Sequence, residues 1–218
     1  MTYMDFVKQI ILSKQEGEPI YIEDIANELS KQFNLDLKKS SAAASVATKR
    51  ILEKNEIPNL RFFQKGIYYR CTKTPFGETD IDKQRLISDK YLAYHSGYES
   101  GDRFLYLLGL TSQLPNAVYL VSNYARDCTR YDEKLEVYTC PPKTEVNEDN
   151  KLYLQILDAL SMFDKSPIDA ERPYKIIDDY IRENHLQYDK LLYYADRFYS
   201  KKTVLHLAHS AGQRESLL

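Results

Sequence analysis

The stretch from residue 38 to residue 70 constrains the fold most strongly, because a helix of small side chains is followed there by a short hairpin. The helical pattern covers Lys38–Asn55. Ala44, Ala47 and Ile51 recur on one face of this helix, so we expect that face to pack inward. The opposite face carries small side chains, which would let the helix backbone approach a partner closely.

The hairpin is predicted after Pro58, which cannot continue the helix because it lacks a backbone N–H. Two β-prone runs, Leu60–Phe63 and Ile67–Arg70, are separated by three residues that end in Gly66. Glycine readily supplies the positive φ that a tight hairpin turn needs. The sequence therefore predicts two antiparallel strands joined near Gly66.

The segments before this stretch complete an order of elements. We expect a helix over Met1–Lys14, an extended segment over Pro19–Ile22, a second helix over Glu23–Phe33 and a turn over Asn34–Leu37. The order helix, short strand, helix, turn, helix, hairpin is typical of a winged helix-turn-helix domain. Three helices without the hairpin would fit a helical bundle as well.

Positive charge is concentrated in the same stretch. Residues 38–73 contain 9 Lys and Arg against 2 Asp and Glu, a net charge of +7, whereas the whole chain has −2. A basic patch of this kind is the electrostatic footprint of nucleic-acid binding, although a solvated lysine-rich helix carries the same charge. Residues 1–75 have a net charge of +3 and residues 76–218 of −5. We predict a DNA-binding domain over 1–75 and a second domain over 76–218.

The predicted contacts with double-stranded DNA form two groups. One group consists of cations that would hold phosphates, which gives affinity but little sequence preference: Lys38, Lys39, Arg50, Arg61, Lys65 and Arg70. The other group lies on the outer face of the helix and would face base edges in the major groove: Ser41, Ala42, Ser45, Val46 and Lys49.

The remainder of the chain predicts a mostly helical domain with a small sheet, so the predicted fold class is α+β and mostly helical. We expect a linker at Cys71–Phe76 and a loop at His95–Asp102, where Ser100 or Asp102 would cap the following helix. Two strands, Ala117–Val121 and Leu135–Thr139, are expected to pair.

The helical segments of this second domain follow from apolar residues at helical spacing. They are expected over Thr79–Tyr94, Asn147–Phe163, Asp169–Glu183 and, as one long segment, Tyr188–His209. The very apolar run Arg103–Leu110 is expected to be buried.

No pattern indicates catalysis, a metal site or a cofactor. His206 and His209 are spaced to lie close together on a helix, but no third ligand accompanies them. Cys71, Cys128 and Cys140 lie far apart without a neighbouring His motif, and we expect reduced thiols. Acidic residues occur around the expected strand Leu135–Thr139, but their spacing is not that of a metal-dependent nuclease. The glycine-containing loop His95–Asp102 lacks the Lys-Ser or Lys-Thr of a phosphate-binding loop.

The location of the protein is predicted from what the sequence lacks. No run of 18 apolar residues would make a membrane-spanning helix, and the first residues do not follow the pattern of a signal peptide. We expect a cytoplasmic protein that is not an enzyme and does not contact a membrane.

Two consecutive strings resemble the body of AbiEi-type antitoxins. They are Gly97–Thr111 (GYESGDRFLYLLGLT) and Gln113–Asn123 (QLPNAVYLVSN). That family typically has a hairpin with the motif G-I-Y, present here as Gly66–Tyr68, and Lys190–Phe198 (KLLYYADRF) resembles its closing helix. The resemblance extends over about residues 23–198.

This resemblance implies the antitoxin of a type IV toxin–antitoxin pair with a role in phage defence. Such antitoxins are DNA-binding transcriptional repressors of their own operon, acting on operator DNA as a homodimer or as two monomers. The C-terminal domain counters a nucleotidyltransferase-like toxin, and direct binding of the toxin is not part of the expectation. The alternative is a winged-helix module for protein interaction, with the tyrosine-rich second domain as an interface, or another transcriptional regulator without an antitoxin role.

Overall fold

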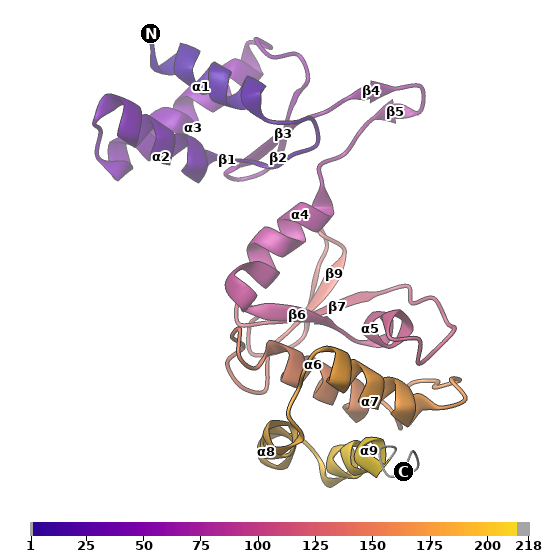
Figure 1. Cartoon of the computed structure of the whole chain (residues 1–218). Helices are drawn as coiled ribbons and strands as arrows, with labels where there is room; N and C mark the ends of the chain where they lie inside the picture. The colour runs from indigo at the N-terminus through magenta and orange to yellow at the C-terminus, as the bar shows by residue number, and fades with distance from the viewer. Residues whose placement is uncertain (1, 213–218) are drawn as a thin grey trace. The chain divides into compact units, whose positions relative to one another are not determined.

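The computed structural model describes residues 2–212 of the chain, which form an α+β fold with small sheets (Figure 1). The chain divides into two compact units, Met1–Leu86 (unit 1) and Ile87–Leu218 (unit 2). The boundary predicted between residues 75 and 76 lies within a hairpin of unit 1. Among the described residues no helix has both the length and the apolar character needed to cross a membrane.

Unit 1 contains the predicted order of elements. These are α1 (Tyr3–Ser13), β1 (Ile20–Tyr21), α2 (Ile22–Phe33), α3 (Leu37–Glu53), β2 (Leu60–Gln64) and β3 (Ile67–Arg70). The strands form an antiparallel sheet in the order β1-β3-β2. Gly66 lies in the β2–β3 turn with a φ of +82°, as the hairpin prediction required.

Local caps fix where α3 begins. Asn34 ends α2 in the left-handed conformation, with a φ of 50°. The side chain of Asp36 then accepts a hydrogen bond from the backbone N–H of Lys39 at 2.8 Å, so α3 begins at Leu37, one residue earlier than predicted. Two caps, with only Leu35 between them, therefore end α2 and begin α3.

The core of unit 1 is built from the apolar faces of its three helices and its sheet. Ala44, Ala47 and Ile51 are buried as predicted, together with Ile25 and Leu29 of α2. Burying a large aliphatic side chain stabilises a fold by about 1.5–3 kcal/mol. The inner face of α3 is thereby committed to the core, and its outer face remains in solvent.

The prediction of a linker at Cys71–Phe76 is wrong. Residues Lys73–Thr74 (β4) and Gly77–Glu78 (β5) form a two-stranded antiparallel hairpin. Cys71 is buried, and its backbone N–H donates to the carbonyl of Asn59 at 2.8 Å. Proline and glycine suggested a linker, but Pro75 lies in the turn between the two short strands and Gly77 is the first residue of β5.

Unit 2 contains a four-stranded sheet and a layer of helices. Its strands are β6 (Gly97–Ser100), β7 (Val118–Ser122), β8 (Arg130–Asp132) and β9 (Val137–Cys140), in the order β6-β7-β9-β8. Helix α4 (Lys83–Ile87) crosses the boundary, and only its last residue belongs to unit 2. The helical segments that follow are η1 (Ser88–Leu92), η2 (Ala93–His95), α5 (Asp102–Leu107), α6 (Lys151–Ser161), α7 (Pro173–Glu183), α8 (Tyr188–Phe198) and α9 (Lys201–Ala211).

Helix α6 lies between the sheet and helices α8 and α9 (Figure 1). On one side Leu154 packs with Tyr98 of β6 and Val121 of β7. On the other side Ile156 and Leu160 pack into a cluster with apolar residues of α7, α8 and α9. This helix is therefore the centre of the core of unit 2.

The sheet confirms one prediction and corrects another. Strands β7 and β9 pair, as predicted. Their orientation is parallel. The loop predicted at His95–Asp102 contains strand β6, which pairs with β7 from Gly97 to Ser100. Neither Ser100 nor Asp102 caps α5, because the N-cap is Gly101 with a φ of +76° and no side-chain bond.

Three helical segments also differ from prediction. The helix predicted over Thr79–Tyr94 begins only at Lys83 and ends in a π-helical and a 3₁₀ turn. The long segment Tyr188–His209 is two helices, because Ser200 accepts a hydrogen bond from the backbone N–H of Thr203 and starts a new helix. Within the run Arg103–Leu110, Phe104, Leu105 and Leu110 are buried, but Tyr106 and Leu107 are exposed.

Candidate nucleic-acid interface

The five residues predicted to face bases all lie on α3 and are all exposed: Ser41, Ala42, Ser45, Val46 and Lys49. Val46 is 48% exposed, so its methyl groups are accessible to an apolar contact such as a thymine methyl group. Since most of these side chains are short, a duplex could approach the backbone of α3 closely.

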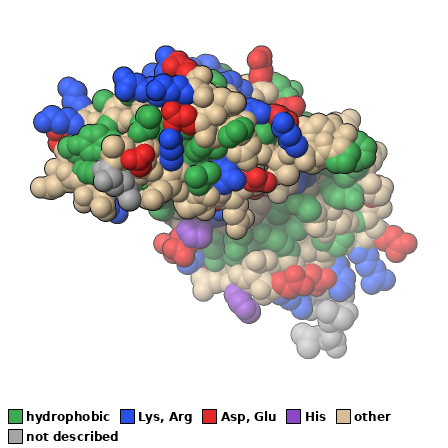
Figure 2. Space-filling view, turned by 90° about the horizontal axis from the view of Figure 1, so that it is seen from above, with side chains coloured by type: hydrophobic (Ala, Val, Ile, Leu, Met, Phe, Trp, Pro, Cys, Tyr) green, Lys and Arg blue, Asp and Glu red, His purple; other side chains and the backbone are tan. Residues whose placement is uncertain are grey.

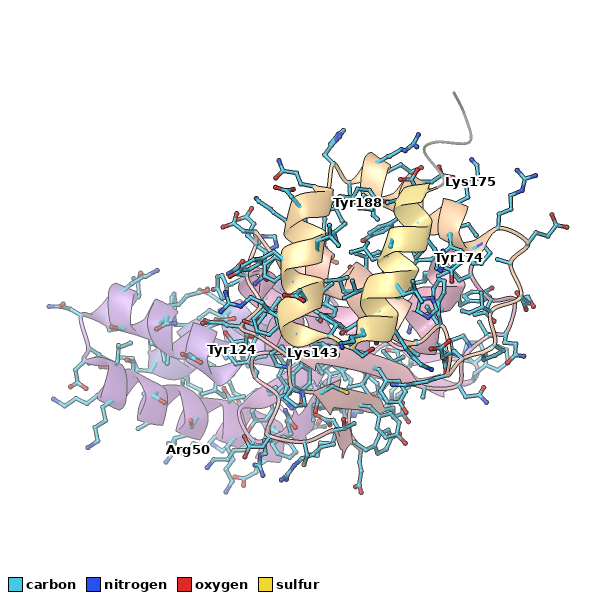
Figure 3. The ribbon with its side chains drawn as sticks, turned by 90° about the horizontal axis from the view of Figure 1, so that it is seen from below. Arg50, Tyr124, Lys143, Tyr174, Lys175 and Tyr188 are labelled. Carbon is cyan, nitrogen blue, oxygen red and sulfur yellow. The ribbon has the colours of Figure 1, made fainter. Side chains whose placement is uncertain are left out.

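The predicted phosphate contacts on α3 are exposed as well. Lys38, Lys39 and Arg50 lie at the two ends of the helix, and Figure 3 labels Arg50 on its outer side. Lys39 approaches Asp36 at 3.5 Å and Lys49 approaches Glu53 at 3.6 Å. Both are solvent-exposed ion pairs, which are worth at most about 1 kcal/mol, so a phosphate can replace the carboxylate.

Lys65 is exposed in the turn between β2 and β3. Within residues 2–212, the side chains of Lys38, Arg50 and Lys65 make no ion pair and no hydrogen bond. These three cations are therefore available to a polyanion without breaking any contact in unit 1.

Arg61 differs, because its guanidinium group is already occupied. Its Nε and Nη2 donate to the Glu78 carboxylate at 2.8 and 2.5 Å, and its Nη1 donates to the carbonyls of Pro58 and Leu60 at 2.9 Å. The hydrogen bond to Glu78 raises the pKa of Arg61 above its ordinary value. This bidentate pair ties β2 to β5.

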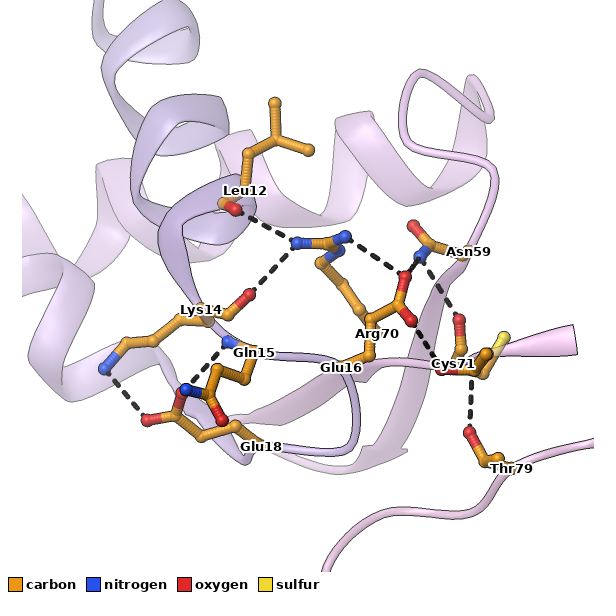
Figure 4. Close-up of polar contacts among 10 residues, drawn as sticks. Leu12, Lys14, Gln15, Glu16, Glu18, Asn59, Arg70, Cys71 and Thr79 are labelled. Atoms are coloured by element: carbon orange, nitrogen blue, oxygen red, sulfur yellow. Dashed lines mark hydrogen bonds and ion pairs between the residues drawn. The ribbon is translucent and has the colours of Figure 1, made fainter.

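Arg70 is occupied in the same way (Figure 4). Its Nη1 donates to the carbonyls of Leu12 and Lys14, both at 3.0 Å, and its Nη2 lies 3.4 Å from the Glu16 carboxylate. The side chain is only 16% exposed. Arg70 therefore fastens the segment after α1 to strand β3, and a DNA phosphate would have to displace these contacts.

Charges of both signs share the surface. Figure 2 shows Lys and Arg side chains with Asp and Glu side chains interspersed among them. The face seen in this view is therefore not uniformly basic. The available cations lie at the two ends of α3 and at the tip of the β2–β3 hairpin.

Sequence reasoning missed a second group of basic and aromatic side chains, which surrounds a depression in unit 2 beside β8. It includes Lys90, Arg126, Arg130 and Tyr124. These residues come from three separate segments of the chain, and no local pattern connects them.

The histidines and cysteines, which are potential metal ligands or nucleophiles, do not form such a site in the described residues. His206 Nδ1 lies 2.8 Å from the hydroxyl of Tyr174, and its Nε2 lies 3.5 Å from Asp164. All three cysteines are free thiols. Among the described residues no three or more His, Cys, Asp or Glu side chains are grouped so that they could hold a metal ion.

Comparison with known proteins adds no family assignment. A scan against protein-family models finds no match to this chain, and a search of curated proteins finds no significant match.

Proposed function

We propose that unit 1 is a winged helix-turn-helix domain that binds double-stranded operator DNA. The observation that carries the proposal is the outer face of α3, where small exposed side chains lie between Lys38 and Arg50, two cations whose side chains have no partner in the described residues of unit 1. A helix with this distribution suits insertion into the major groove, with base contacts in the middle and phosphate contacts at both ends.

The contacts that we propose are a revision of the predicted set. Lys38, Lys39, Arg50 and Lys65 hold phosphates. Ser41, Ala42, Ser45, Val46 and Lys49 face the bases. Arg61 and Arg70 instead stabilise the hairpin that presents Lys65, because their guanidinium groups are bound to Glu78 and to the segment after α1.

We further propose that the protein is the antitoxin of a type IV toxin–antitoxin pair and represses its own operon. This part rests on the resemblance over residues 97–123 and 190–198 to AbiEi-type antitoxins. In this proposal unit 2 counters a nucleotidyltransferase-like toxin, and the antitoxin itself performs no catalysis.

A gel-shift experiment tests the DNA-binding proposal. The probe is the DNA upstream of the gene, and a scrambled duplex of equal composition is the competitor. Ser45→Ala should reduce the preference for the upstream duplex, whereas Lys65→Ala should weaken binding to both duplexes alike. Equal affinity of the unchanged protein for both duplexes would contradict sequence-specific binding.

A growth experiment tests the antitoxin proposal separately. The full chain is co-expressed with the product of the adjacent reading frame, beside the triple variant Lys38→Ala, Arg50→Ala, Lys65→Ala. We expect the unchanged chain and the triple variant both to rescue growth, and only the variant to lose repression of the operon. If the partner co-purifies and no duplex is shifted, the protein-interaction module is the better description.

A further inference from the structure

The last two helices of unit 2 leave an outer face that no other described element of that unit covers. Helices α8 and α9 lie side by side (Figure 3), and the hydroxyl of Tyr188, at the start of α8, lies 3.3 Å from Ser210 Oγ, near the end of α9. The two helices are therefore antiparallel and in a fixed register. Leu191, Ala195 and Leu207 are fully buried, so the opposite sides of both helices face solvent.

Large apolar side chains lie exposed in the middle of this face. Leu192 and Tyr193 on α8 are 45% and 52% exposed, and Leu205 on α9 is 56% exposed. The contact between Tyr188 and Ser210 places Leu192 and Leu205 at nearly the same height along the helix pair. Exposed apolar side chains that gather on adjacent elements indicate contact with another protein surface.

The unpaired charges beside these apolar residues differ in sign between the two helices. Asp189 and Asp196 lie on α8, about one turn before and one turn after its exposed apolar residues, and both are exposed. Lys201 is exposed on α9, one turn before Leu205. Within residues 2–212, the side chains of these three charged residues have no hydrogen bond and no ion pair. Each helix therefore presents unpaired charge of one sign.

The other cations of the two helices already have contacts within unit 2. Arg197 Nη1 donates to a tyrosine hydroxyl of its own helix, and Lys190 Nζ lies 5.9 Å from the centroid of a tyrosine ring on α6. Lys202 pairs with an aspartate of the loop between α6 and α7 at 3.2 Å. A partner on the outer face would therefore meet the aspartates of α8 and Lys201 of α9.

We propose that this face binds a second copy of the same chain, with α8 of each copy lying on α9 of the other. A twofold axis parallel to the helices exchanges α8 and α9 and keeps each residue at its height. Asp196 and Lys201 both lie close to the turn between the helices, so Asp196 of one copy meets Lys201 of the other. Leu192 likewise packs on Leu205 of the other copy.

The face is complementary to itself, because opposite charges lie on opposite helices and each contact occurs twice in the dimer. The inference does not depend on the function proposed for unit 1.

The size of the face predicts a weak association. Each helix has 11 residues and is therefore about 16 Å long. Two packed helices are about 20 Å wide, so each copy offers a face on the order of 300 Å². This area is at the low end for specific interfaces, where association is transient. We expect an equilibrium of monomer and dimer that depends on protein concentration.

Sedimentation velocity of the full-length protein without DNA tests the proposal. Asp196→Lys and Lys201→Glu should each weaken association about tenfold, because a pair that occurs twice changes from attraction to repulsion. An equimolar mixture of the two variants should restore association, since both pairs in the mixed dimer are again between opposite charges.

Matched variants decide whether this face is responsible. Lys190→Glu makes the same charge reversal as Lys201→Glu at an exposed position on the flank of α8, and it should leave association unchanged. Leu205→Ser should weaken association without unfolding unit 2, because the side chain is exposed. Thermal unfolding followed by circular dichroism shows whether each variant keeps its fold.

Three results would overturn the proposal. One is an unchanged protein that is monomeric at every concentration. Another is a mixture of Asp196→Lys and Lys201→Glu that associates no more strongly than each variant alone, since the interface would then lie elsewhere. The third is equal weakening by Lys190→Glu and Lys201→Glu, which would show that only net charge matters.

Discussion

If unit 1 binds a duplex as we propose, the salt dependence of that binding can be calculated from its available cations. Four of the six predicted phosphate contacts are exposed and available: Lys38, Lys39, Arg50 and Lys65. Each neutralised phosphate of a duplex contributes about −0.9 to the slope of log K against log salt concentration, so four contacts give about −3.6. Affinity should then fall roughly 150-fold between 50 and 200 mM salt.

Variants separate the available cations from the occupied ones. Lys65→Ala should bring the slope to about −2.7 and the triple change of Lys38, Arg50 and Lys65 to about −0.9. Lys31→Ala removes the same charge from an exposed position on α2 and should leave the slope unchanged. Arg61→Ala should also leave it unchanged in folded protein, because that guanidinium is bound to Glu78.

Fluorescence anisotropy titrations of a labelled duplex at five salt concentrations give each slope. The reasoning is refuted if the triple variant retains the slope of the unchanged protein. It is also refuted if Lys31→Ala lowers the slope as much as Lys65→Ala does, since the charge of the whole unit would then be responsible.

Three further predictions concern stability. Arg70→Ala should lower the free energy of unfolding by about 2–4 kcal/mol in chemical denaturation, because two carbonyls and Glu16 lose a charged donor; no loss would mean that these bonds contribute nothing. Gly97→Ala should prevent stable folding of unit 2, seen as lost thermal cooperativity, because the added Cβ would lie 2.4 Å from one backbone carbonyl and 2.6 Å from another; a normal transition would contradict this geometry. Burial raises the pKa of Asp158 above its ordinary 3.8, although the hydroxyls of Tyr98 and Tyr199 donate to it. Its contribution to stability is therefore present below pH 3.8 and is lost as the pH rises through the higher folded pKa, so Asp158→Asn should flatten this loss in urea titrations between pH 3 and 8, and an unchanged profile would argue against it.

The sequence predicted unit 1 well because its signals are local. Pro58 and Gly66 mark the two ends of β2, and apolar residues recur at helical spacing along α2 and α3. The outer face of α3 follows directly from which side is buried. The start of α3 differs by only one residue, because Asp36 takes the N-cap position.

The sequence failed where partners are distant. Arg70 is 54 residues from Glu16, and Arg61 is 17 residues from Glu78, so a local charge count cannot tell that both arginines are occupied. The segment of strand β6 was predicted as a loop because it begins with one glycine and is followed by another. Its conformation is instead decided by pairing with β7. The contact between the Tyr131 and Tyr138 rings depends on sheet register in the same way.

The central claim is that the outer face of α3 enters a DNA groove. A photo-crosslinking amino acid placed at Ser45 tests this most directly, with Gln32, an exposed position on α2, as the matched site. With duplex from upstream of the gene, the account predicts a crosslink at position 45 that excess unlabelled duplex abolishes, and none at position 32. Equal crosslinking at both positions, or none at position 45, would contradict it.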